Sequence, residues 1–227
     1  MPYYGYARKD RKDEGRVPIT AKLVANLVTE AGADRLLTID LHAAQIQGFF
    51  DIPVDHLLAF PVFSSYYKQK NLSDFVVVSP DVGGIKIARL YSKHLNMRLA
   101  VVDKRRTGPE ETEVGFVIGD VKDRNAIIID DLIATGGSIC EAARVLKEKG
   151  AKDIYVGATH PVLCGSAAEK LGSSLIKEIA VTDTIPLNDN AKSLGTKIKT
   201  LSVASLLGEA IKRIHTNTSI SSMFSEH

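Results

Sequence analysis

The stretch AIIIDDLIATGGSI, residues 126–139, decides the fold of this chain. Its opening apolar run predicts a buried strand over 126–129, and the residues that follow predict a helix over 138–149. The same order of strand, carboxylate, paired glycines and helix recurs in VVVSPDVGG, residues 76–84. In parallel α/β sheets, ligands bind at the carboxyl ends of strands. Both stretches are therefore candidate binding loops at one edge of a sheet.

Further strands and helices alternate along the rest of the chain. Apolar runs predict more strands at 36–41, 75–79, 99–102, 114–118, 154–158, 175–181 and 198–201. Helical periodicity predicts helices at 18–31, 62–69, 85–95, 166–171 and 206–214. The stretch FFDIPVD is interpreted as a turn at Pro53. This alternation predicts an α/β fold with a mainly parallel sheet covered on both faces.

Composition excludes several classes of function. The 227 residues carry 29 Lys and Arg against 27 Asp and Glu, a net charge of +2, so no global field attracts nucleic acid or membrane. No stretch approaches the ~20 apolar residues of a membrane span. The two cysteines, Cys140 and Cys164, are far apart, which is typical of reduced thiols in a cytoplasmic protein. Any function that depends on charge must therefore be local.

The residues around the paired glycines predict a ligand with a diol and a phosphate. Gly136 and Gly137 let the backbone approach a ligand at a helix start, where unpaired N–H groups favour an anion. Thr135 and Ser138 add hydroxyl donors. The two preceding carboxylates would repel a phosphate, so we expect them to accept hydrogen bonds from a vicinal diol. Together they predict a ribose 5-phosphate site.

Of three other interpretations of this loop, one is disfavoured and two are excluded. A TGGS sequence at a helix start can be a helix cap with flexible glycines, but the acidic pair directly before it disfavours that interpretation. A Walker loop is excluded because no GxxxxGK[ST] occurs, and a dinucleotide fold because no GxGxxG follows a strand.

Several longer motifs resemble the ribose-phosphate pyrophosphokinase (PRPP synthetase) family. These are YGYARKDRK at 4–12, DLHAAQIQGFFDIPVDHL at 40–57, SPDVGG at 79–84, VDKRR at 102–106, GDVKDR at 119–124 and the IIIDDLIATGGSI loop. The resemblance implies a type I phosphoribosyltransferase fold. It implies transfer of the β,γ-pyrophosphoryl group of ATP to the C1 hydroxyl of ribose 5-phosphate, with Mg²⁺ as cofactor. It also implies a homo-oligomer, often a hexamer.

The resemblance also implies a role for each matched residue. Lys104 and Arg106 correspond to catalytic positions, and Arg106 also to a ribose 5-phosphate contact. Arg8, Lys9 and His42 correspond to ATP-binding positions, and His42 and Asp81 to metal positions. The ribose 5-phosphate site would comprise Asp130, Asp131, Ala134, Thr135, Gly136, Gly137 and Ser138. Two positions depart from the family pattern: Lys9 replaces a usual Gln, and Ala134 replaces a usual Asp.

The resemblance also predicts the domain organisation. Residues 1–58 are interpreted as the remnant of an N-terminal pyrophosphokinase domain, with 208–227 packing back on it. Residues 59–207 are interpreted as a complete phosphoribosyltransferase-like domain. About the first third of the family's length has no counterpart, which is a sizeable part of a domain of typical size. Two alternatives stay open. One is a truncated or non-catalytic subunit that binds phosphoribosyl ligands and regulates or assembles with full-length subunits. The other is a phosphoribosyltransferase, which would share the glycine loop but not DLHAAQIQGFF or KRR.

Overall fold

The computed structural model describes residues 1–12, 14–70, 74–105 and 114–224. Its contacts divide the chain into two units. Unit 2 comprises residues 60–203, and unit 1 comprises residues 1–59 together with 204–227. The expected assignment of 1–58 with 208–227 to one domain and 59–207 to another, as incomplete and complete copies of one fold, stays a prediction.

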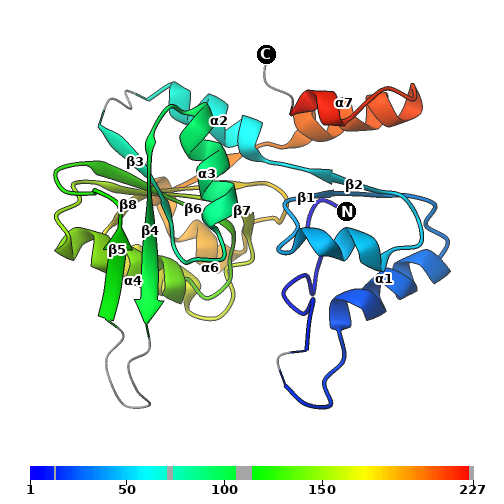
Figure 1. Ribbon diagram of the computed structural model, residues 1–227, viewed down its shortest axis with the longest axis horizontal. Helices are drawn as coiled ribbons and strands as arrows, with labels where there is room; N and C mark the ends of the chain where they lie inside the picture. The colour runs from blue at the N-terminus through cyan, green and yellow to red at the C-terminus, as the bar shows by residue number, and fades with distance from the viewer. Residues whose placement is uncertain (13, 71–73, 106–113, 225–227) are drawn as a thin grey trace. The chain divides into compact units, whose positions relative to one another are not determined.

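Unit 2 is built on a sheet with the strand order β5-β4-β3-β6-β7-β8-β9 (Figure 1). All neighbouring pairs are parallel except β4 and β5, which are antiparallel. The order places β6 in the middle, where both of its faces can be buried. The strands are β3 (Phe75–Ser79), β4 (Arg98–Arg105), β5 (Val114–Ile118), β6 (Asn125–Ile133), β7 (Ile154–Pro161), β8 (Ile176–Thr182) and β9 (Ile198–Leu201).

Helices cover both faces of this sheet. On one face, Val78 and Ile128 belong to the apolar core that includes α4 (Gly137–Glu148) and α5 (Ala167–Ser173). The other face carries α2 (Phe60–Lys68) and α3 (Ile85–His94), and the side chain of Tyr67 on α2 reaches the backbone of Gly157. A short helix, α6 (Asp189–Lys192), and the turn η2 (Gly195–Lys197) precede β9. Strands buried on both faces explain why their sequences are continuous apolar runs rather than alternating ones.

Unit 1 contains a parallel pair of short strands, β1 (Leu36–Ile39) and β2 (Val54–Leu57). The other edge of β1 pairs with the start of the chain: the Ile39 amide donates to the Pro2 carbonyl at 3.0 Å. Figure 1 shows α1 (Thr20–Glu30) and η1 (Ala44–Phe49) on one side of this pair and α7 (Ala204–His215) on the other. The pattern predicted no strand at β2, and that was wrong: its side chains are mostly half-buried, so its apolar signal is weak.

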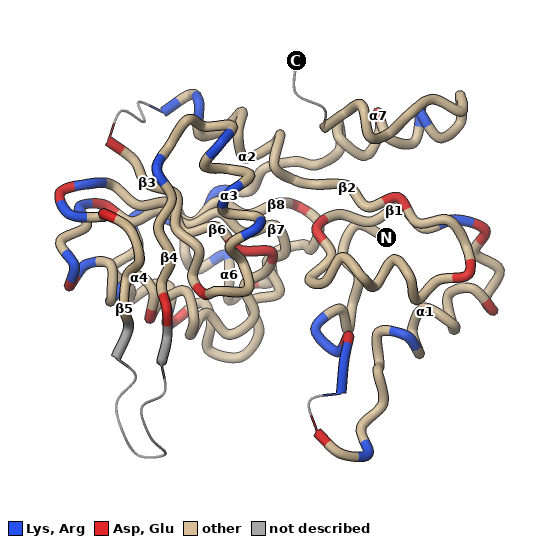
Figure 2. Tube along the Cα trace, in the orientation of Figure 1, with Lys and Arg blue, Asp and Glu red and all other residues tan. Residues whose placement is uncertain are grey.

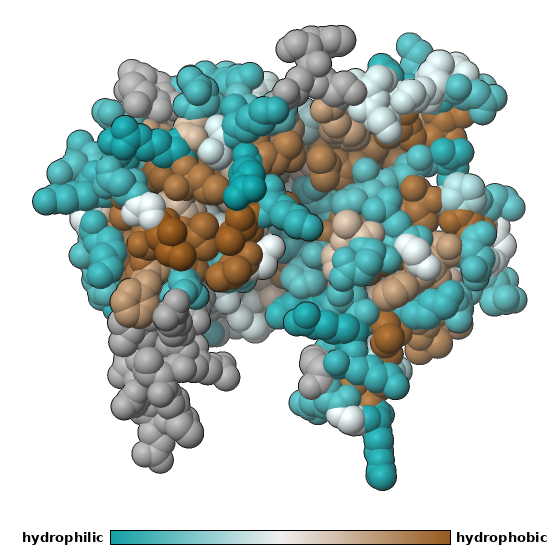
Figure 3. Space-filling view, viewed as in Figure 1, coloured by the Kyte–Doolittle hydropathy of each residue, from teal (hydrophilic) through white to brown (hydrophobic). Residues whose placement is uncertain are grey.

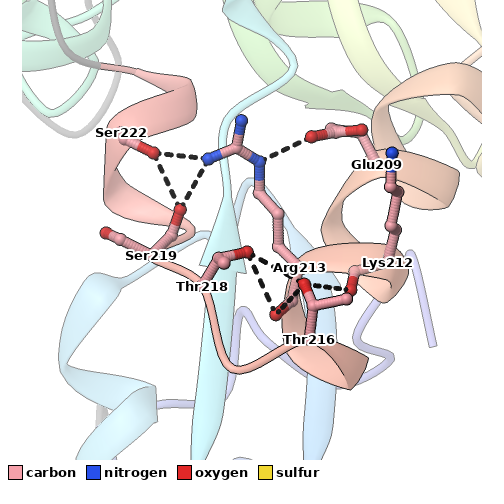
Figure 4. A network of polar contacts seen from close by, with 7 residues as sticks. All are labelled: Glu209, Lys212, Arg213, Thr216, Thr218, Ser219 and Ser222. Atoms are coloured by element: carbon pink, nitrogen blue, oxygen red, sulfur yellow. Dashed lines mark hydrogen bonds and ion pairs between the residues drawn. The ribbon is translucent and has the colours of Figure 1, made fainter.

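The C-terminal turn of unit 1 is tied to α7 by one arginine (Figure 4). The Arg213 guanidinium accounts for three hydrogen bonds, to the Glu209 carboxylate at 2.7 Å, the Ser219 carbonyl at 2.8 Å and the Ser222 hydroxyl at 2.5 Å. Ser222 lies in the short turn η3 (Ser221–Met223). The planar fork of an arginine suits this arrangement, because one rigid group can serve several acceptors.

Positive and negative side chains are mixed over the described residues (Figure 2). Figure 2 shows Lys and Arg interspersed with Asp and Glu along both units, in agreement with the small net charge. Figure 3 shows apolar side chains gathered among hydrophilic ones on the visible face of unit 2. Among the exposed apolar residues of this unit are Phe116 and Ile118 of the edge strand β5. None of the helices in the described residues is long and apolar enough to cross a membrane.

Two strands that carry proposed site residues, β4 and β6, extend further toward their carboxyl ends than the apolar runs predicted. β4 continues through Arg105 because β5 pairs with its end, Lys104 opposite Gly115. β6 continues through both aspartates because β7 pairs beside it, Asp130 opposite Ala158. Lys104 and the two aspartates therefore belong to strands, not to the loops that follow them, and strand pairing fixes their backbone.

Candidate active site

The carboxyl ends of β3 and β6 bring two acidic groups together. The strands are parallel neighbours in the register Val78 to Ile128, so the residues that follow them meet at one edge of the sheet. The carboxylate of Asp81, two residues beyond β3, is close enough to raise the pKa of Asp130. The two recurring sequence patterns therefore converge on one site.

The adjacent carboxylates of Asp130 and Asp131 form the centre of this site. Asp130 is half-buried and Asp131 is buried, and Oδ1 of Asp130 accepts the Asp131 amide at 2.9 Å. The pKa of Asp130 lies well above its usual range, first because of burial and then because of the neighbouring carboxylates of Asp131 and Asp81. Carboxylates held in this way are stabilised by a ligand that donates hydrogen bonds to them.

The loop after β6 leads directly into α4. Gly136 caps the helix with φ of 74°, a left-handed conformation that favours glycine. A Cβ on Gly136 would also lie 3.3 Å from Cγ of Leu171, so α5 packs closely against this turn. Thr135, Gly137 and Ser138 are exposed at the start of the helix. The first N–H groups of a helix have no partner within it, and the exposed residues here add two hydroxyl groups beside them, which suits an anion.

The turn after β3 is held by hydrogen bonds of its own. The Ser79 hydroxyl donates to the Asp81 carbonyl at 2.6 Å, and Oδ1 of Asp81 accepts the Gly84 amide at 3.0 Å. Sequence reasoning singled out Asp81 and the glycines but missed Ser79. Its position directly at the end of an apolar strand was the available signal.

The expected cationic residues are spread over several elements. Lys104 lies near the end of β4, three residues beyond the pair of Val101 with Ser79, so its backbone reaches the edge of the sheet where Asp81 lies. Arg106 lies outside the described residues. Arg8 and Lys9 are exposed in an N-terminal turn of unit 1, in which the Lys9 amide donates to the Tyr6 carbonyl at 2.8 Å.

His42 is exposed in unit 1, shortly after β1. The turn before it is braced at two points. Asp40, with φ of 39°, accepts the Ala59 amide at 3.2 Å, and the Leu41 amide donates to Nε2 of His56 at 2.9 Å. Burial lowers the pKa of His56, which favours the neutral ring that can accept this bond. The brace by His56 was missed from the sequence, because nothing in a single sequence shows that β1 and β2 pair.

The residues at the edge of the sheet fit a magnesium ion that keeps other ligands. Within the described residues, no group of three or more His, Cys, Asp or Glu side chains is arranged to hold a metal. Oδ2 of Asp81, however, makes no hydrogen bond in the described part of the chain. Mg²⁺ in nucleotide enzymes is often held by one or two carboxylates, with water and substrate phosphates completing the shell. A lone available carboxylate oxygen agrees with that kind of site.

A mainly parallel sheet that carries an acidic pair and a glycine-rich helix start at its carboxyl edge defines a type I phosphoribosyltransferase fold. The chain matches the model of the phosphoribosyl synthetase-associated domain over residues 107–225 and that of the N-terminal domain of ribose phosphate pyrophosphokinase over residues 1–32. The chain belongs to the ribose-phosphate pyrophosphokinase family.

Relatives that match nearly the whole chain support the same family assignment. A ribose-phosphate pyrophosphokinase of Oceanobacillus iheyensis is 54% identical over 99% of this chain and 70% of its own length. One from Rhodopirellula baltica is 56% identical over 100% of this chain and 72% of its own length. The crystal structure of the phosphoribosylpyrophosphate synthetase from Mycobacterium smegmatis matches with a TM-score of 0.88 and 41% identity, covering 95% of this chain and 70% of that one.

Proposed function

We propose that this protein forms PRPP and AMP by transferring the β,γ-pyrophosphoryl group of ATP to the C1 hydroxyl of ribose 5-phosphate. One observation carries this proposal beyond family membership: the adjacent Asp130 and Asp131 carboxylates lead within a few residues into the exposed donors of the α4 N-terminus. Ribose 5-phosphate has a vicinal diol that can donate to the two carboxylates and a phosphate that can accept from the α4 N-terminus. ATP and ribose 5-phosphate are therefore the proposed substrates.

The proposed roles follow from the chemistry of each group. Asp130 and Asp131 accept hydrogen bonds from the ribose hydroxyls, and the loop around Gly136 holds the 5-phosphate. Lys104 and Arg106 are the proposed catalytic residues, because pyrophosphoryl transfer is promoted mainly by positioning and by cations that stabilise the negative charge. The remaining contacts proposed for ribose 5-phosphate are Ala134, Thr135, Gly137, Ser138 and Arg106.

The nucleotide side of the reaction is proposed on unit 1. Arg8, Lys9 and His42 are the proposed ATP contacts, and His42 and Asp81 the proposed Mg²⁺ ligands. When bound, Mg²⁺ would neutralise charge on the phosphate chain and help align it. A homo-oligomer and a cytoplasmic location complete the proposal. The family resemblance supports the first, and the free thiols of Cys140 and Cys164 agree with the second.

The test measures AMP and PRPP formed from ATP and ribose 5-phosphate by the full chain. Lys104→Ala should lower kcat by at least ~100-fold, the scale of losing one group that stabilises the transition state. The dissociation constant for ribose 5-phosphate should change little. Lys149→Ala, at an exposed lysine of the same unit, is the matched control. Ribose 5-phosphate binding without AMP formation by the wild-type chain would favour a non-catalytic phosphoribosyl-binding subunit instead.

A further inference from the structure

The turn that carries Asp81 is anchored by a buried hydroxyl group. Ser79, the last residue of β3, is 0% exposed. Its Oγ donates to the backbone carbonyl of Asp81 at 2.6 Å, across only two residues. A bond this short, made by a fully buried donor, keeps the chain from straightening after the strand. The backbone of Asp81 is therefore held in one place relative to β3.

The Asp81 carboxylate is held in turn by one of its two oxygens. Oδ1 accepts the Gly84 amide at 3.0 Å at the start of α3, while Oδ2 makes no hydrogen bond in the described residues. The Asp81 carboxylate also interacts electrostatically with Asp130 across the β3–β6 pair. One oxygen thus fixes the direction of the carboxylate, and the other is left for a ligand.

Gly84 is glycine for reasons of space rather than backbone conformation. Its φ of −80° is one that any residue adopts. A Cβ at this position would lie 2.8 Å from Oγ of Ser79, closer than such atoms approach in proteins. A Cβ on Gly83 would lie 3.2 Å from Oδ1 of Asp81, which is tight but less severe. The hydroxyl of Ser79 and the missing side chain of Gly84 therefore depend on one another.

We propose that Ser79 is a positioning residue for the pyrophosphoryl transfer, and that its hydroxyl and the empty space at Gly84 form one lock that orients the Asp81 carboxylate. This inference rests on the proposed function, in which Asp81 is a magnesium ligand. Ser79 itself contacts no substrate. Its effect on the reaction passes through Asp81.

A double-mutant cycle on the full chain tests the lock without any ligand. The unfolding midpoint is measured for wild type, Ser79→Ala, Gly84→Ala and the double variant. Removing the hydroxyl makes room for the new methyl group, so Gly84→Ala should lower the midpoint less in the Ser79→Ala background than in wild type. If the Gly84→Ala chain fails to fold but the double variant folds, that result would show the same coupling between the two positions. Additive losses would overturn the proposal, because contacting groups must couple.

A second measurement tests the effect on the reaction. Ser79→Ala should raise the Mg²⁺ concentration for half-maximal AMP release at least threefold, while the dissociation constant of ribose 5-phosphate stays within twofold. Ser64→Ala, at a buried serine on α2, is the control for losing a buried hydroxyl. A Mg²⁺ requirement of Ser79→Ala equal to that of the control would overturn the proposal.

Asp81→Asn separates the two possible failures. If Asp81→Asn raises the Mg²⁺ requirement and Ser79→Ala does not, only the positioning role of Ser79 is wrong. If neither substitution changes the requirement, the proposed role of Asp81 as a magnesium ligand is wrong, and the positioning role fails with it.

Discussion

Asp40 and Asp130 lie in similar sequence contexts but have different roles in the structure. Each interrupts or follows a strongly apolar strand, Asp40 after β1 in unit 1 and Asp130 within β6 in unit 2. Both acids accept a backbone amide, Asp40 from Ala59 and Asp130 from Asp131, but the pKa of Asp130 is also raised, first by burial and then by the neighbouring carboxylates of Asp131 and Asp81. A backbone donor alone therefore does not separate a structural acid from a candidate for chemistry. The neighbouring carboxylates do, because acids held close together are stabilised by a ligand that donates hydrogen bonds to them.

The largest effect should follow from removing the Asp130 carboxylate. At a pH above the raised pKa of Asp130, where the carboxylate is charged, Asp130→Ala should weaken ribose 5-phosphate binding by ~10- to 150-fold, because a hydrogen bond to a charged group contributes ~1.5–3 kcal/mol. Calorimetric titration with ribose 5-phosphate measures the change. Asp153→Ala, at an exposed acid paired with Lys177, is the control. Unchanged affinity in Asp130→Ala would contradict the diol site.

The corresponding change at Asp40 should act on stability. Asp40→Ala leaves the buried Ala59 amide without its acceptor, which costs ~1–3 kcal/mol in the free energy of unfolding. Asp40→Asn keeps an acceptor and tolerates the left-handed φ of 39°, so it should lose much less. Denaturant unfolding of both variants measures the difference. Equal losses in the two would show that the charge of Asp40, not its hydrogen bond, matters.

The pH dependence of stability should report the raised pKa of Asp130. The pKa of Asp130 is raised on folding, so the folded chain holds a proton that the unfolded chain releases, and stability falls as pH rises from ~4 through that raised value. Asp130→Asn removes this loss and still offers an oxygen to the Asp131 amide. Its unfolding midpoint should exceed that of wild type at neutral pH, and the difference should shrink toward pH ~4. A gain of the same size at both pH values would show another cause.

The smallest effect concerns a buried polar group with neither a partner nor a proposed role. The Tyr67 hydroxyl is buried without a hydrogen-bond partner in the described residues. Tyr67→Phe should therefore raise the free energy of unfolding by up to ~1 kcal/mol and leave ribose 5-phosphate affinity unchanged. Tyr66→Phe is the matched control, because that hydroxyl donates to Glu178 at 2.8 Å and its loss should not stabilise. A destabilised Tyr67→Phe would reveal a partner for the hydroxyl.

How much could be predicted from the sequence depended on burial. β3, β5 and β9 have the predicted bounds, and β6 was expected from its isoleucines, because strands covered on both faces are apolar throughout. β2 was missed, since a half-covered strand of four residues shows little pattern. The glycine loop after β6 was also predictable: the left-handed φ at Gly136 calls for a residue without Cβ.

The site residues also divide into those that could be named from the sequence and those that were missed. The acidic pair and Asp81 could be named from the sequence, because carboxylates beside paired glycines at strand ends are locally visible. Ser79 was missed although its place at the end of an apolar strand was a signal, because its bond to the Asp81 carbonyl exists only once the turn closes. His56 gave no signal, because its bond to the Leu41 amide exists only once β1 and β2 pair.

The amino-acid sequence by itself determined the order of strands and helices, the place of the glycine loop and the family to which the chain belongs, since these follow from local periodicity and motifs. Only the tertiary structure decided which acids face one another and which are satisfied by the backbone. The parallel register of β3 and β6 sets Asp81 near Asp130, and the end of β2 places the Ala59 amide against Asp40. Electrostatic and hydrogen-bond energies depend on distances in space, and residues far apart in sequence set those distances.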